Sequence, residues 1–113
     1  MIGAILLGAS IAAIVGIFWE EIVEWLKICV EKIKKIVAGI WYGVKVFLSK
    51  VGENVSQISR HYSKEGDQWY VTQETRKISQ NDVPMDILDK MRRSRAAETD
   101  ITDEIEEKLE LAG

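Results

Sequence analysis

The first nineteen residues of the chain, Met1 to Trp19, contain no charged side chain and a single polar one, Ser10. A helix of this length spans about 28 Å, close to the roughly 30 Å of hydrocarbon in a bilayer. Charged residues begin at Glu20 and continue to the end of the chain. The composition therefore predicts a transmembrane helix over residues 1–19, followed by a charged body.

Two other interpretations of the apolar run stay open. A cleaved signal peptide needs a basic residue ahead of the run and a small-x-small site before Glu20, and the sequence offers neither. A helix that is apolar on all sides is also stable inside a soluble assembly, provided that other helices surround it. One chain of 113 residues cannot supply that shell, so this interpretation requires a homo-oligomer with a central helical bundle.

Small residues recur at every fourth position of the apolar run, at Ala4, Gly8, Ala12 and Gly16. On a helix this spacing makes a shallow groove, and two such grooves approach closely enough to gain van der Waals contact. These residues are the predicted self-association site.

Basic residues follow the apolar run and none precedes it, which places the body of a membrane protein in the cytoplasm and its N-terminus outside. The predicted location is the inner (plasma) membrane, crossed once. Tryptophans and lysines near the end of the run are typical of a membrane interface. The predicted membrane-interface residues are Trp19, Trp25, Lys27, Lys34, Lys35 and Trp41.

Residues 20–51 repeat apolar side chains at spacings of three and four, which predicts one long amphipathic helix. Its apolar face has three candidate partners: the inner leaflet, further copies of the chain, or the C-terminal residues. Cys29 lies on this face, where the expected role is that of a small hydrophobic residue and S-palmitoylation is the alternative. Gly52 is expected to end the helix.

Residues 52–80 change to a period of two and are rich in β-branched and aromatic side chains. The segments 55–63 and 68–79 flank a glycine-containing loop of hairpin length, which predicts a β-hairpin. Neither side of the alternation is cleanly apolar, so we expect a thin, largely exposed hairpin. An isolated hairpin is marginal in water and must pack on a helix or pair through its edges.

Residues 81–113 are expected to form two short helices with an acidic C-terminal tail. The first begins near Pro84, which is tolerated in the first helical turn, and ends near Arg95. The second is acidic and reaches about Leu111, with a disordered tail as the alternative. Its apolar edge is the predicted docking site for a partner protein and consists of Ile101, Ile105 and Leu109.

The sequence shows no constellation of catalytic residues. His61 is the only histidine, is expected on the exposed hairpin, and has no nucleophile motif beside it. Cys29 is the only cysteine, which excludes an internal disulfide and a cysteine-based metal site. We therefore predict no enzymatic activity, no cofactor and no metal. The net charge is −3, and no predicted strand or helix combines a dominant basic face with stacking aromatic side chains, which argues against nucleic acid as a ligand.

The predicted fold class is mainly α: a transmembrane helix (1–19), an amphipathic juxtamembrane helix (20–51), a β-hairpin (52–80) and short helices (81–113), the last two forming a small α+β part. The predicted function is a non-enzymatic, self-associating, single-pass membrane protein that perturbs membranes under a cytosolic control module. The alternatives are a membrane-tethered adaptor for a protein partner and a soluble homo-oligomeric structural protein. The predicted partners are lipid, further copies of the chain and a protein bound through the C-terminal region.

Overall fold

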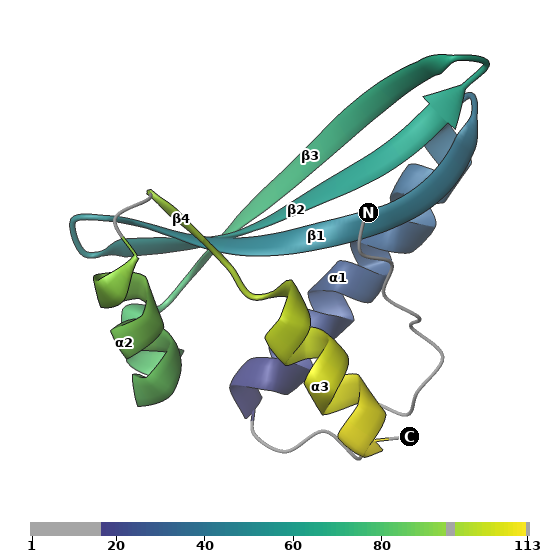
Figure 1. Cartoon of the computed structure of the whole chain (residues 1–113). Coiled ribbons are helices and arrows are strands. Elements are labelled where there is room, and N and C mark those ends of the chain that lie inside the picture. Colours follow the sequence, from purple (N-terminus) through teal and green to yellow (C-terminus); the bar gives the residue numbers. More distant parts are fainter. Residues whose placement is uncertain (1–16, 95–96, 113) are drawn as a thin grey trace.

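The computed structural model describes residues 17–94 and 97–112, with side chains as far as Lys108. The described elements are α1 (Ile17–Ile36), β1 (Ile40–Val51), β2 (Asn54–Glu65), β3 (Gln68–Ile78), the 3₁₀ turn η2 (Gln80–Asp82), α2 (Met85–Arg93), β4 (Glu98–Asp100) and α3 (Thr102–Ala112). The strands form one curved antiparallel sheet in the order β3-β2-β1-β4, and α1 and α3 lie against the same face of it (Figure 1). This is an α+β fold.

The helix α1 supplies one wall of the hydrophobic core. Its apolar residues recur at helical spacing, and Ile22, Leu26 and Ile33 are completely buried. Phe18 and Trp19, at its start, are buried as well and touch edge to face with ring centroids 5.0 Å apart. The apolar face that the sequence shows over 20–36 is therefore covered by the chain's own sheet.

The single long helix predicted over residues 20–51 is wrong, because the helix ends at Ile36 and residues 40–51 form β1. The connection passes through Gly39, where a Cβ atom would overlap the carbonyl group of Lys64, so only glycine fits. In β1 the buried Val44, Val46 and Leu48 alternate with more exposed residues. Their spacing is also compatible with a wide helical face. Residues 40–51 form a strand because they pair with β2 on one side and with β4 on the other.

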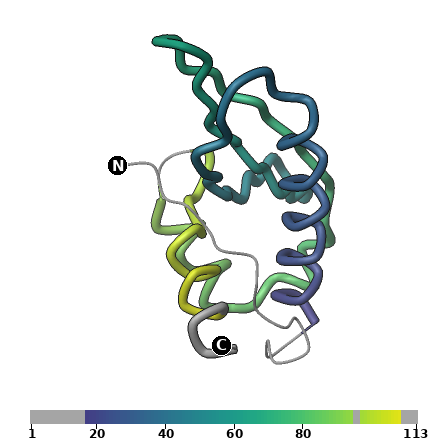
Figure 2. The backbone as a smooth tube through the Cα atoms, turned by 90° about the vertical axis from the view of Figure 1, so that its right-hand side faces the viewer, coloured from purple at the N-terminus to yellow at the C-terminus, as the bar shows by residue number. Residues whose placement is uncertain are grey.

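Two tight turns connect the three long strands. Gly52 and Gly66 have φ angles of 62° and 59° and stand first in their two-residue loops, as type II′ hairpin turns require. The β-hairpin predicted from the sequence is confirmed as β2 and β3, paired from Val55↔Ile78 to Glu65↔Gln68. Its far end projects beyond the helices (Figure 2).

The predicted helices near residues 84–95 and 101–111 are confirmed as α2 and α3. The core lies between the sheet and the helices, and its completely buried members include Ile22, Leu26, Val44, Val46, Leu48, Val55, Ile101 and Ile105.

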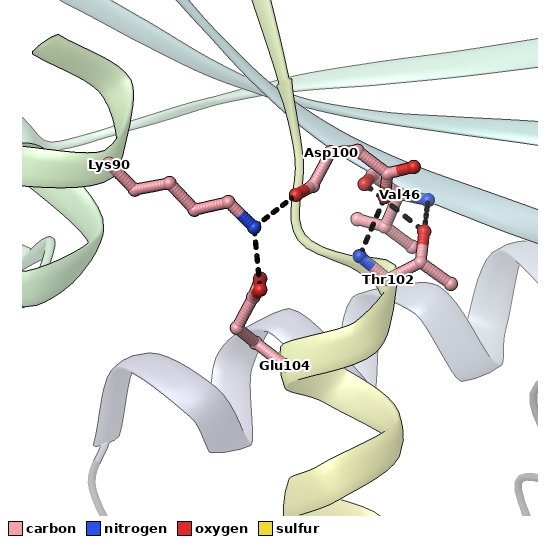
Figure 3. Close-up of polar contacts among 5 residues, drawn as sticks. All are labelled: Val46, Lys90, Asp100, Thr102 and Glu104. Atoms are coloured by element: carbon pink, nitrogen blue, oxygen red, sulfur yellow. Dashed lines mark hydrogen bonds and ion pairs between the residues drawn. The ribbon is translucent and has the colours of Figure 1, made fainter. Parts of the chain in front are cut away.

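Polar contacts fasten the C-terminal elements to the sheet (Figure 3). The Thr102 hydroxyl accepts a hydrogen bond from the Val46 N–H at 2.9 Å, and the Asp100 carboxylate accepts one from the Thr102 N–H at 2.8 Å. The Lys90 ammonium donates to the Asp100 carbonyl at 2.9 Å and to the Glu104 carboxylate at 2.6 Å. Helix α2 is thus tied to the β4–α3 junction, and the junction to β1.

Three further predictions need correction: the single-pass membrane protein, the mainly α fold and the location in the inner membrane. Within residues 17–94 and 97–112, no helix combines the length and the apolar character needed to cross a bilayer. Phe18 and Trp19, assigned to the span, belong to a globular core. Residues 1–16 lie outside the described part of the chain, and with them the predicted self-association residues Ala4, Gly8, Ala12 and Gly16.

Candidate functional site

The two faces of the β2–β3 hairpin differ in polarity. We call the face toward α1 the inner face and the opposite one the outer face. On β2 the inner face carries Val55 at its start and then Gln57, Ser59, His61 and Ser63, which are all polar and all buried. No helix of the described residues lies over the outer face (Figure 1). An antiparallel sheet with one solvated face normally shows the reverse distribution, with apolar side chains turned inward.

The outer face carries a group of large apolar side chains at the end of the hairpin. Tyr42 is 45% exposed, Trp69 51% and Val71 57%, although each could pack in a core. The rings of Tyr42 and Trp69 lie 5.0 Å apart. The strand register places Tyr62 opposite Val71, and Ile40 opposite Lys64 beside them, on the same face. We call this group the aromatic patch; it consists of Ile40, Tyr42, Tyr62, Trp69 and Val71. A contiguous exposed apolar patch of this kind marks an interaction site.

Basic side chains share the outer face with the aromatic patch. The register places Lys45, Arg60, Lys64 and Lys77 on the outer face of β1–β3, all of which the structure describes, and no acidic residue at the outward positions of these strands. The Lys64 ammonium lies 5.4 Å from the centroid of the Trp69 ring, within the range of a cation–π contact. The outer face of β1–β3 is therefore basic in a chain of net charge −3, whereas the outward positions of β4 hold Glu98 and Asp100.

Arg60 is the one of these cations that is held by a salt bridge to an acidic residue of another strand. Its guanidinium donates to both carboxylate oxygens of Glu98 in β4, at 2.8 and 2.6 Å, and to the Gln73 amide oxygen at 3.0 Å. It also stacks over the Phe47 ring at 4.8 Å. The bidentate hydrogen bond lowers the pKa of Glu98 and raises that of Arg60. The pair fixes the middle of the outer face between the patch and β4.

Beneath the inner face, Trp41, His61, Ser59 and Cys29 form a buried polar chain. The Trp41 indole N–H donates to His61 Nδ1 at 3.2 Å, and His61 Nε2 lies 3.1 Å from Ser59 Oγ. Ser59 also contacts the Cys29 thiol. Burial lowers the pKa of His61 to about 4 and, together with the Glu74 charge, raises the pKa of Cys29. At neutral pH the histidine is uncharged and the cysteine is a thiol.

This geometry is unsuited to activating a nucleophile. The Trp41 N–H occupies Nδ1 as an acceptor, so the proton of the neutral ring sits on Nε2 and is donated to Ser59. His61 therefore has no free lone pair with which to take the Ser59 proton. The sequence-based expectation of an exposed His61 is wrong, because the side chain is completely buried.

A second polar group on the inner face attaches α1 to the hairpin. Gln57 donates to the Ile22 carbonyl at 3.2 Å and accepts from Arg76 at 2.9 Å. Burial lowers the pKa of Arg76, whose guanidinium lies 5.6 Å from the Trp25 ring. Lys32 donates to Glu74 at 2.9 Å, which raises the pKa of the lysine. These contacts satisfy the polar inner face of the hairpin within the chain itself.

The predicted membrane-interface residues occupy different surroundings and do not form a belt. Trp19 is buried, whereas Trp25 and Trp41 are half-buried under the cations Arg76 and Lys34. The remaining two, Lys27 and Lys35, lie on α1 and are half-buried and exposed, respectively.

The predicted docking edge of the last helix is used within the chain. Ile101 and Ile105 are completely buried in the core, and the Leu109 side chain lies outside the described part. The aromatic patch was missed as a site, although part of its signal is visible in the sequence: Trp69 and Val71 share one side of the period-two pattern, with Tyr70 and Thr72 on the other. Sequence alone does not say which side of that alternation faces the core.

Among the residues that the structure describes, no group of three histidine, cysteine, aspartate or glutamate side chains is arranged to hold a metal ion. Comparison of the chain with protein-family models, with curated proteins and with solved structures found no match.

Proposed function

We propose that this protein is a binding module, not an enzyme, and that it docks a protein partner on the outer face of its sheet. The observation that carries the proposal is the inverted polarity of the hairpin. Polar side chains of β2 are buried with their hydrogen bonds made inside the chain, while Tyr42, Trp69 and Val71 remain in water.

The composition of the outer face is that of an interface centre. Tryptophan, tyrosine and arginine are the residue types that most often carry binding energy, because they combine a large apolar area with a polar or charged group. Tyr42, Trp69 and Arg60 provide all three on one surface. Fully burying an aromatic side chain removes about 150–250 Å² from water, so the patch has enough area to anchor a partner.

One observation favours a protein over nucleic acid as the ligand, and a second favours binding over catalysis. The outward positions of β4 place Glu98 and Asp100 on the same face of the sheet, which opposes binding of a polyanionic nucleic acid across it. The buried chain of Trp41, His61 and Ser59 has no acceptor free to serve as a general base, which supports a binding role.

The proposal is tested with the double variant Trp69→Ser/Val71→Ser in quantitative affinity purification of the intact chain. Thr75→Ser, on the outer face of the same strand but outside the patch, is the matched control. We expect the bound proteins to be lost from the patch variant and kept by the control, with equal denaturation midpoints for all three chains. A bound set that is the same for all three would refute docking on this face.

A further inference from the structure

The strand β3 is an edge of the sheet along its whole length. It pairs with β2 over all eleven residues from Gln68 to Ile78, and no other described strand pairs with its far side. The opposite edge is covered in part: β4 pairs with Phe47–Ser49 of β1 and Val46 is bonded to Ile101 and Thr102, whereas no described strand pairs with the far side of residues 40–45. Unpaired backbone groups along an edge are a template for a further strand.

The turn geometry identifies which backbone groups of β3 are free. A two-residue hairpin closes with a hydrogen-bonded pair, here Glu65 and Gln68, and hydrogen-bonded pairs then recur at every second residue. Applied to the β1–β2 hairpin, the same rule predicts that the backbone groups of Val46 point away from β2. The structure agrees, because the Val46 N–H donates to the Thr102 hydroxyl and the Val46 carbonyl accepts from the Ile101 N–H. On β3 the backbone groups that point to the free edge belong to Trp69, Val71, Gln73, Thr75 and Lys77.

The residues with free backbone groups are also those whose side chains lie on the outer face. A strand added to β3 would place every second side chain on the outer face, and those opposite Trp69 and Val71 would lie beside the aromatic patch. Lys77 ends this row on β3, and Lys64 of β2 lies opposite Trp69 at its start; none of the outward positions of β2 and β3 is acidic. The charge at this edge is complementary to an acidic segment.

The inner side of the same edge selects against apolar strands. Glu74 and Arg76 lie there, bonded to Lys32 and Gln57 and turned toward α1. A strand added to β3 would set its inward side chains next to these charges, where apolar residues are disfavoured. The favoured segment is therefore acidic and apolar on one side and polar on the other.

Resting on the proposed function, we infer that the partner binds as an extended acidic segment that adds a strand to the free edge of β3. Main-chain hydrogen bonds to the edge hold the segment, and its outward side chains reach the aromatic patch and the lysines. The patch then determines which segment is accepted.

The test uses a short capped peptide with glutamate and tyrosine alternating on one side and threonine on the other, titrated into the intact chain and followed by backbone amide NMR. Two versions are N-methylated, each at one of the two alternating sets of positions. We expect only one version to lose binding, because only one set of N–H groups faces β3. Replacing glutamate by lysine should weaken binding by about tenfold or more.

The protein variant Thr75→Pro provides a second arm. The Thr75 N–H points to the free edge, so proline there spares the β2 ladder but removes a donor for an added strand. We expect about a tenfold weaker peptide affinity than for the matched control Thr75→Val. If Thr75→Pro does not fold, the N-methylated peptides still test whether a strand is added to β3.

The outcomes separate this inference from the proposed function. Equal binding of both N-methylated peptides, with loss in Trp69→Ser/Val71→Ser, would overturn strand addition and leave docking on the patch intact. Equal binding of the lysine peptide, or no binding of the glutamate peptide, would overturn the acidic segment. Tighter binding of a single-stranded RNA oligonucleotide through the patch would overturn both.

Discussion

The two faces of the β2–β3 hairpin show opposite relations between polarity and burial. On the inner face, Gln57, Ser59 and His61 are buried and their side chains find hydrogen-bond partners in the chain. On the outer face, Trp69 and Val71 are apolar and exposed. Buried polar groups are tolerated in a fold when they are hydrogen-bonded. Exposed aromatic side chains contribute no burial free energy as long as their surface remains in water. The inner face of the hairpin is therefore buried and hydrogen-bonded within the chain, whereas apolar side chains of its outer face remain exposed to water.

The neighbouring strand β1 shows the conventional pattern. Val44, Val46 and Leu48 are buried against α1, and Lys45 and Ser49 alternate with them on the other side. The apolar core therefore comes from α1, β1, Val55 at the start of β2 and the C-terminal elements, and the polar part of β2 continues the buried face toward the hairpin end. The side chains that form the core and those that remain exposed as the aromatic patch therefore lie on opposite faces of the sheet.

The largest effect is expected from the apolar core. Leu48→Ala should lower the free energy of unfolding by about 2–4 kcal/mol, because it leaves a cavity in a completely buried site. Trp69→Ala, on the outer face, should cost less than about 1 kcal/mol. Guanidinium denaturation of both variants and of wild type measures the two changes in the free energy of unfolding. An equal cost at Trp69 would mean that the patch belongs to the chain's own core.

The pH dependence of stability should be dominated by the inner face. Burial lowers the pKa of His61 from 6.5 to about 4, so the unfolded chain binds a proton that the folded chain does not between these values. Stability is full above pH 6.5 and should fall by about 3 kcal/mol in total as the pH drops to 4. Urea denaturation of wild type and His61→Gln over this range isolates the effect, since the variant should lose this component. Parallel pH profiles would exclude His61 as the group responsible.

Two glutamines on neighbouring strands make a matched comparison of the faces. Gln57→Leu should lower the free energy of unfolding by about 1–3 kcal/mol, because Arg76 loses its acceptor in a half-buried position. Gln73→Leu, whose exposed amide accepts from Arg60, should cost less than about 0.5 kcal/mol. Chemical denaturation at neutral pH measures both. A larger cost at Gln73 would reverse the assignment of the two faces.

The smallest effect concerns the ion pair on the outer face. Glu98→Gln should lower stability by about 0.5–1 kcal/mol at low salt and less at high salt, since the pair is partly exposed. In wild type the same contribution is present above pH 4.5 and is lost as the pH falls through the lowered pKa of Glu98. A double-mutant cycle with Arg60→Gln gives the coupling energy. A coupling of zero would show that the pair positions Arg60 without stabilising the fold.

Much of the local structure was predictable from the sequence. The hairpin of β2 and β3 follows from its period-two alternation and Gly66, and α2 and α3 from their starts and apolar edges. The strand β1 was not, because Val44, Val46 and Leu48 satisfy a strand, while the wider set of apolar residues over 20–51 satisfies a helix. Periodicity alone does not separate the two when pairing partners lie elsewhere in the chain.

The candidate site was predictable only in part. The alternation of Trp69 and Val71 with Thr72 and Glu74 is visible in the sequence, but both sides of the hairpin have mixed polarity. Which side is buried depends on Gln57 reaching the Ile22 carbonyl and on Trp41 reaching His61, contacts 35 and 20 residues apart in the chain. Such contacts leave no periodic signal.

By itself, the sequence determined the break at Gly52, the hairpin loop at Gly66 with a strand on each side, and where the C-terminal helices form, since these depend on glycine conformation, local spacing and side-chain shape. The tertiary structure decided that α1 ends at Ile36, that His61 is buried and that Trp69 is exposed. These outcomes depend on which surfaces meet across the core, where hydrogen bonds between distant residues outweigh the local preference of each segment.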